Sequence, residues 1–120
     1  MKKILIVDDK ISIGKILNMY LSKEFEIYYF ENPVRAIGWM ENGITPDLII
    51  SDVRMPIMSG HDFLFYLKGN SLWQDIPVVM LSSEESTIER INLLQMGAAD
   101  YILKPFNPME LKVRINRLLV

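Results

Sequence analysis

The chain has 120 residues, of which 50% are hydrophobic, and 13 basic and 15 acidic side chains give it a net charge of -2. This length supports one well-buried core and is too short for two ordinary domains, so residues 1–120 are expected to form a single domain. The charges are well mixed and form no basic stripe, which argues against direct binding of nucleic acid by this segment.

The chain has few of the cysteine and histidine residues that often bind metals or form covalent links, and this limits its possible chemistry further. The chain has no cysteine, which excludes disulfides and thiol catalysis, and its single histidine excludes a multi-histidine metal site. The lack of cysteine agrees with a cytoplasmic protein.

The first predicted strand covers residues 4–7 and ends at Asp8 and Asp9. Because its apolar run is so short, we expect neither a secretory nor a membrane-inserting segment there. The segment that follows has apolar residues at helical spacing, which predicts the first helix. These residues are Ile13, Ile16, Leu17, Tyr20 and Leu21.

The rest of the chain continues to alternate between strands and helices. Short apolar runs bounded by polar or turn residues predict strands at 25–30, 48–51, 77–81 and 101–104. Helices are predicted from Asn32 to Gly43, from Ser59 to Leu67, through Ile88, Ile91, Leu94 and Gln95 up to Gly97, and from Asn107 through Leu111, Ile115, Leu118 and Leu119. Asn32-Pro33 is a typical helix start, and residues 107–110 resemble a capping box.

Five strands alternating with five helices predict a doubly wound α/β fold, with a parallel sheet covered on both sides. Ligands bind such sheets at the carboxyl ends of the strands. Polar residues stand at four of these ends: Asp8 and Asp9 after the first strand, Asp52 after the third, Ser82 after the fourth and Lys104 at the fifth. The sequence therefore predicts one site with three carboxylates, a hydroxyl and an ammonium group.

Three carboxylates in one cleft repel one another and require a cation. A hard divalent ion, Mg²⁺ or Mn²⁺, suits carboxylate, carbonyl and water oxygens and leaves positions open for phosphate. A carboxylate beside such an ion can attack phosphorus and form an aspartyl phosphate. Lys104 would then supply a second positive charge, and Ser82 a hydrogen bond to the new phosphoryl group.

The motifs as a set resemble the receiver domain of response regulators over essentially the whole chain. They are residues 4–9, residues 46–56, Gly60, residues 80–82 and residues 97–106, in the order and at the spacing of that family. The resemblance implies a flavodoxin-like or CheY-like fold with strand order 2-1-3-4-5. It also implies a signalling switch that catalyses only its own aspartyl phosphorylation and dephosphorylation.

The resemblance assigns roles to the acidic residues. It implies that Asp52 is the phosphoacceptor and that Asp9 binds the metal directly, while Asp8 acts mainly through metal-bound water. The backbone carbonyl of Arg54 would complete the protein ligands. The phosphoryl donor would be a sensor histidine kinase or a phosphotransfer protein.

The same resemblance implies a switch. Lys104 would pair with the phosphoryl group, and the peptide bond before Pro105 is expected to be cis. On phosphorylation the Ser82 hydroxyl would move toward the phosphoryl oxygen and Tyr101 would rotate from outside to inside. The surface that changes would be formed by the fourth helix, the fifth strand and the fifth helix.

A further likeness concerns receivers of winged-helix transcription factors of the OmpR/PhoB type, which dimerise through that surface. Arg90 is expected to face Glu110, and Asp100 to face Arg114, across a two-fold axis. Ala99 departs from the pattern, since that subfamily usually has another acid there. The chain is expected to be either a stand-alone receiver or the first domain of a longer regulator.

Four other residues affect the site, two as departures from the family pattern and two as neighbours. Lys10 follows the acidic pair where the family more often has an acid, which predicts weaker metal binding. Ser82 replaces the commoner threonine and keeps the hydroxyl. Arg54 and Glu84, each two residues beyond a site residue, are expected to flank the phosphoryl position, or else to form a plain surface pair.

Two other functions are compatible with parts of the pattern. A phosphatase of the haloacid-dehalogenase type also uses an aspartyl nucleophile and Mg²⁺, but it needs an acid two residues later, where this chain has Arg54. A pseudo-receiver would bind partners without being phosphorylated. Loss of an acidic position or of the lysine would favour that reading, and none is lost.

Overall fold

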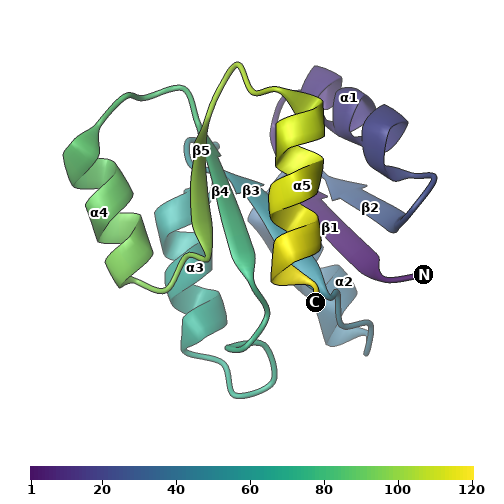
Figure 1. The fold of residues 1–120 in the computed structure, drawn as a ribbon. Coiled ribbons are helices and arrows are strands. Elements are labelled where there is room, and N and C mark those ends of the chain that lie inside the picture. The colour runs from purple at the N-terminus through teal and green to yellow at the C-terminus, as the bar shows by residue number, and fades with distance from the viewer.

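Five parallel strands form one sheet, with helices on both sides, in the computed structural model, which describes residues 1–120 (Figure 1). The elements are β1 (Lys3–Val7), α1 (Ile11–Leu21), β2 (Glu26–Phe30), α2 (Pro33–Glu41), β3 (Leu48–Asp52), α3 (Gly60–Lys68), β4 (Val78–Ser82), α4 (Thr87–Gln95), β5 (Asp100–Leu103) and α5 (Pro108–Leu118). The strand order is β2-β1-β3-β4-β5. The structure thus confirms the predicted α/β class and the strand order.

Alternation along the strands divides the core into two layers. Leu5 and Val7 of β1 belong to the cluster that packs against α2, α3 and α4, whereas Ile4 and Ile6 belong to the cluster that packs against α1 and α5. Because successive side chains of a strand point to opposite faces, a strand that is apolar throughout must be covered on both sides. Figure 1 shows α1 and α5 on one face of the sheet and α2 and α3 on the other.

The helix starts largely follow the predicted capping residues. Asn32 Oδ1 accepts a hydrogen bond from Arg35 N at 3.0 Å, with Pro33 as the first helical residue. Asn107 Oδ1 likewise accepts from the backbone N–H groups of the second and third residues of α5. No bond returns to Asn107 N, so only the Asn107 half of the predicted capping box forms.

Helix α4 is present as predicted, but the spaced apolar residues that predicted it lie on its exposed side. Ile88 is 74% exposed, and Ile91 and Leu94 are 46% and 43% exposed. The buried residues of α4 are Leu93 and Glu89, which lie one helical turn apart. The side of α4 that packs on the sheet is therefore defined by one leucine and one acid.

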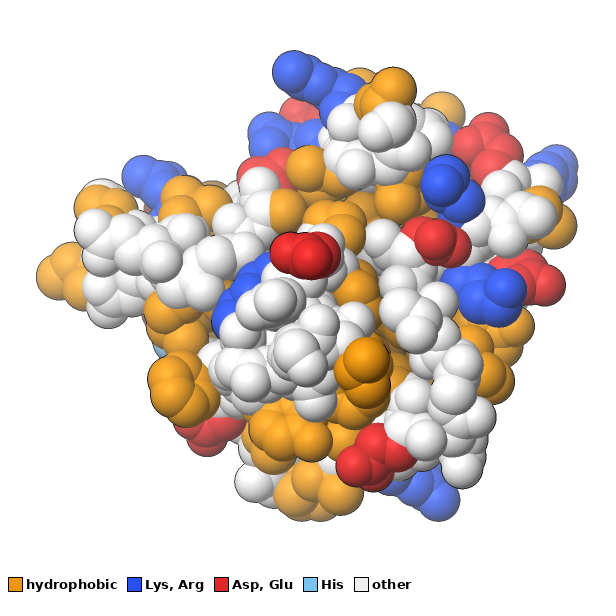
Figure 2. Space-filling view, turned by 90° about the horizontal axis from the view of Figure 1, so that it is seen from below, with side chains coloured by type: hydrophobic (Ala, Val, Ile, Leu, Met, Phe, Trp, Pro, Cys, Tyr) orange, Lys and Arg blue, Asp and Glu red, His pale blue; other side chains and the backbone are white.

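The surface has charges of both signs, as the composition predicted. On the face shown in Figure 2, the Lys and Arg side chains lie interspersed with Asp and Glu. None of the helices is both long enough and apolar enough to cross a membrane.

Candidate functional site

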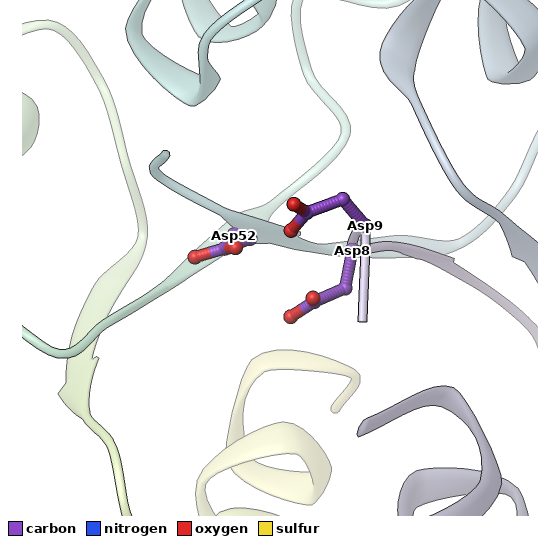
Figure 3. Close-up of side chains that lie close together, drawn as sticks. All are labelled: Asp8, Asp9 and Asp52. Atoms are coloured by element: carbon purple, nitrogen blue, oxygen red, sulfur yellow. The ribbon is translucent and has the colours of Figure 1, made fainter. Parts of the chain in front are cut away.

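Three aspartates meet at the carboxyl edge of the sheet. Asp8 and Asp9 directly follow β1, and Asp52 is the last residue of β3, the neighbouring strand. The parallel register pairs Val7 with Ser51, which brings Asp8 beside Asp52. One carboxylate oxygen from each aspartate lies within 4.8 Å of those of the others. Figure 3 shows the three side chains close together at this edge.

Lys104 links two of these carboxylates. Its Nζ donates to Asp8 Oδ2 at 2.8 Å and lies 3.2 Å from Asp52 Oδ1. Asp8 is 1% exposed and Asp52 is 4% exposed, so these ion pairs are shielded from water. Lys104 follows β5 directly, and the peptide bond that joins it to Pro105 is cis.

One oxygen of Asp52 has no hydrogen-bond partner. Oδ1 accepts from Val53 N at 2.8 Å, while Oδ2 is buried and unbonded. Lys10 Nζ is 3.9 Å from Oδ2 and 3.6 Å from Asp9 Oδ1. A buried carboxylate oxygen without a donor is costly, and this one lies where a cation or an electrophile would be stabilised.

Burial, and next the negative charge of Asp8, raise the pKa of Asp52 above the ordinary aspartate value, although Lys104 opposes the shift. The folded protein therefore holds a proton on Asp52 up to a higher pH than the unfolded chain does. The protonated Asp52 side chain stabilises the folded protein fully at pH values below the ordinary aspartate pKa. This stabilisation is lost as the pH rises through the raised pKa of the folded state.

We therefore expect Asp52→Asn to unfold with a higher free energy than the wild type at neutral pH in metal-free buffer, by on the order of 1 kcal/mol. The difference should shrink as the pH falls toward the ordinary aspartate pKa. Urea unfolding of both proteins across this pH range measures it. A wild type that is the more stable protein at neutral pH would contradict the expected sign.

The loop after β3 brings the start of α3 against Asp52. Gly60 N donates to Val53 O at 2.7 Å. Before it, Met58 N donates to Pro56 O at 2.8 Å across Ile57, whose φ of 76° is unusual for a β-branched residue. This tight turn was not predicted, because isoleucine in a sequence carries no signal for positive φ.

Ser82 and Tyr101 converge on Glu89, which was not among the predicted site residues. The buried Ser82 hydroxyl donates to Glu89 Oε2 at 2.9 Å. The Tyr101 hydroxyl donates to the same oxygen at 2.5 Å and lies 2.8 Å from the carbonyl oxygen of Glu84. Tyr101 is buried, so its side chain lies inside rather than outside in this structure.

A sequence signal for Glu89 did exist. Ser86 caps α4 by accepting from Glu89 N at 3.1 Å, and Glu at this third helical position is the usual partner in a capping box. In a capping box, the glutamate side chain would turn back toward the capping residue, in solvent. In the structure the side chain points inward instead, on the same side of α4 as Leu93.

Arg54 and Glu84, predicted to flank the site, make only a weak contact with each other. Arg54 Nε lies 3.8 Å from Glu84 Oε1, and both side chains are more than half exposed. Such a pair adds little stability. The closer contact of Arg54 is with Glu89, where Nη2 lies 2.6 Å from Oε1.

The four charged residues predicted for a dimer face lie around β5. Arg90, Glu110 and Arg114 line one shallow groove that also contacts β5. Within the single chain Arg114 Nη1 pairs with Asp100 Oδ2 at 2.9 Å, and Arg114 Nε lies 3.8 Å from Glu110 Oε2. Their expected pairing across a two-fold axis stays a prediction.

The comparisons with known proteins agree with this geometry. Residues 4–116 match the family model described as "Response regulator receiver domain". The chain is 40% identical to "Probable transcriptional regulator ycf27" of Cyanophora paradoxa, over 98% of the chain and 48% of that protein. It is 38% identical to "Phosphate regulon transcriptional regulatory protein PhoB" of Escherichia coli (strain K12), over 95% of the chain and 50% of that protein.

A solved structure gives the same result for the fold. The chemotaxis protein CheY4 of Vibrio cholerae superposes with a TM-score of 0.92 at 32% identity, covering 99% of both chains. The present chain spans about half the length of the two curated regulators that it resembles.

Proposed function

Because this chain belongs to the response regulator receiver domain family, we propose that it is a phosphorylation-dependent signalling switch in which Asp52 is the phosphoacceptor. The observation that carries the proposal is the state of the Asp52 carboxylate. Its Oδ1 lies 3.2 Å from Lys104 Nζ, while Oδ2 is buried with no donor. A carboxylate with one oxygen held and the other free is suited to nucleophilic attack.

The acidic cluster fits a divalent metal ion. Its donors are hard oxygens close enough to share one ion, and the unbonded Asp52 Oδ2 is among the cluster's buried atoms. Asp9, Asp52 and the backbone carbonyl of Arg54 would hold Mg²⁺ or Mn²⁺, with Asp8 acting through bound water. When bound, the ion neutralises the repulsion between these carboxylates and an anionic phosphoryl donor.

The transfer itself needs little from the protein beyond position and charge. An oxygen of Asp52 attacks phosphorus, the phosphorus–nitrogen bond to the histidine of a sensor kinase or phosphotransfer protein breaks, and a phosphorus–oxygen bond forms. Lys104 would stabilise the charge on the phosphoryl oxygens. The Ser82 hydroxyl would then donate to the bound phosphoryl group.

We expect acetyl phosphate with Mg²⁺ to add the mass of one phosphoryl group to the wild type and none to Asp52→Asn. The substitution removes the nucleophilic oxygen while it keeps the size of the side chain. Intact-protein mass spectrometry measures the gain, and a sample with excess chelator is the control for metal dependence. Asp47→Asn is the matched substitution away from the site, since Asp47 Oδ2 binds Lys3 N at the other end of the sheet.

A wild type that gains no phosphoryl mass and does not bind beryllofluoride would overturn the phosphorylation proposal. That outcome would favour a pseudo-receiver that binds partners independently of phosphorylation. A gain that persists in Asp52→Asn would instead place the phosphoryl group on another residue.

The proposed output surface is α4, β5 and α5. Phosphorylation would change the packing around Ser82 and Tyr101 and so promote a homodimer through Arg90, Glu110 and their neighbours on that surface. Light scattering on the phosphorylated and unphosphorylated samples tests for the dimer. The curated relatives are named as transcriptional regulators, which supports a transcriptional output if this chain is part of a longer regulator.

A further inference from the structure

Glu89 is a buried charge that the proposed phosphorylation chemistry does not use. It is 8% exposed, and among the buried polar residues of the chain it is the only charged one outside the aspartate cluster. Burying a carboxylate is costly unless it is fully paired, so its surroundings must supply donors.

Three side chains from three separate parts of the chain supply those donors. Arg54, just after β3, lies 2.6 Å from Glu89 Oε1. Ser82, at the end of β4, and Tyr101, in β5, donate to Oε2 at 2.9 and 2.5 Å. Hydrogen bonds to an ionised acceptor are about twice as strong as neutral ones, so this carboxylate holds all three donors firmly.

The hydroxyl of Ser82 links Glu89 to the reacting site. A serine hydroxyl carries a single proton and can donate it to one acceptor at a time. If Ser82 donates to a phosphoryl oxygen on Asp52, it must give up its bond to Glu89. The two anions therefore exclude each other as acceptors for this proton.

We propose that Glu89 is an internal anion that holds Ser82, Tyr101 and Arg54 before phosphorylation and competes with the phosphoryl group on Asp52 for the Ser82 hydroxyl. This inference rests on the proposed function of Asp52. Glu89 is thus a positioning residue that acts through Ser82. The phosphoryl group can shift the switch only by contacts that differ between the unphosphorylated and phosphorylated states. Because the Ser82 hydroxyl must leave Glu89 to reach the phosphoryl group, Glu89 lowers the net free energy that this contact contributes.

The same contacts account for the buried position of Tyr101. Burial, and next the hydrogen bond to Glu89, raise the pKa of the Tyr101 hydroxyl, so it remains a donor at neutral pH. Glu89 thereby provides an acceptor for a tyrosine that would otherwise be buried with only the carbonyl of Glu84. We therefore expect the Tyr101 side chain to be held less firmly in its buried position in Glu89→Gln than in the wild type.

The test is a beryllofluoride titration in Mg²⁺, with this anion as a stand-in for the phosphoryl group on Asp52. Glu89→Gln keeps the shape of the side chain and removes its charge, so we expect it to bind beryllofluoride about fivefold more tightly than the wild type. Glu85→Gln makes the same change of net charge on the exposed neighbouring loop, and its affinity should equal that of the wild type. Glu89→Asp, which keeps the charge but shortens its reach, is the second variant if Glu89→Gln unfolds, and it should also bind more tightly.

The Ser82→Ala background separates competition from a general structural effect. Without the hydroxyl there is no shared proton, so adding Glu89→Gln to Ser82→Ala should leave the affinity for beryllofluoride unchanged. A purely structural role of Glu89 would shift the affinity equally in both backgrounds.

The failures of the two proposals are distinguishable. Wild-type binding that depends on Asp52, combined with equal or weaker binding by Glu89→Gln, overturns the role of Glu89 alone. Equal effects of Glu89→Gln with and without Ser82 overturn it as well. If neither the wild type nor Glu89→Gln binds beryllofluoride, the proposed function of Asp52 is overturned. The proposed competition between Glu89 and the phosphoryl group is then overturned as well.

Discussion

Replacing Lys104 with methionine is expected to lower the free energy of unfolding at neutral pH by about 3 kcal/mol, because it removes one partner of a buried ion pair. Lys104 Nζ lies 2.8 Å from Asp8 Oδ2 and 3.2 Å from Asp52 Oδ1. Methionine fills a similar volume but leaves both carboxylates without their main counter-charge. Urea unfolding in metal-free buffer measures the loss.

Lys3→Met is the matched control. Lys3 Nζ lies 3.3 Å from Glu26 Oε2, but both side chains are well exposed, so the expected loss is below about 1 kcal/mol. Adding Asp8→Asn to Lys104→Met should recover much of the stability, since it removes one of the two unpaired charges. Equal stability of Lys104→Met and Lys3→Met would show that the carboxylates do not depend on the buried ammonium group.

Replacing Gly60 with alanine is expected to lower the free energy of unfolding by about 3 kcal/mol as well, for a steric reason. A Cβ at Gly60 would lie against the backbone carbonyl oxygen of Asp52 and 2.8 Å from Val53 Cα. Backbone atoms at the end of a central strand cannot move aside without breaking the ladder. The variant should also gain phosphoryl mass more slowly, because the strand end carries Asp52.

Gly38→Ala is the control for the intrinsic effect of this substitution. Gly38 lies inside α2, with nothing within 4 Å of an added Cβ, so alanine there should stabilise the protein by about 0.5–1 kcal/mol. Urea unfolding of the two variants should therefore give opposite signs. A Gly60→Ala protein as stable as the wild type would mean that β3 and α3 can separate at this point at no cost.

Much of the fold could be predicted because the relevant signals are local. The apolar runs that end at Asp8 and Asp52 mark buried parallel strands, and Asn32-Pro33 marks a helix start. Helix α4 was the clearest exception, since its spaced apolar residues, Ile88 among them, face solvent. Periodicity alone does not tell whether an apolar stripe packs on the sheet or remains on the surface.

By itself, the sequence determined the α/β class, the alternation of strands and helices and the gathering of Asp8, Asp9, Asp52, Ser82 and Lys104 at one edge of the sheet. All of these follow from short-range patterns and from the rule that parallel strands end on the same side. Only the tertiary structure decided which groups are in contact there. It directs Glu89 inward and leaves one oxygen of Asp52 unbonded, because side-chain direction and burial depend on elements far apart in the chain.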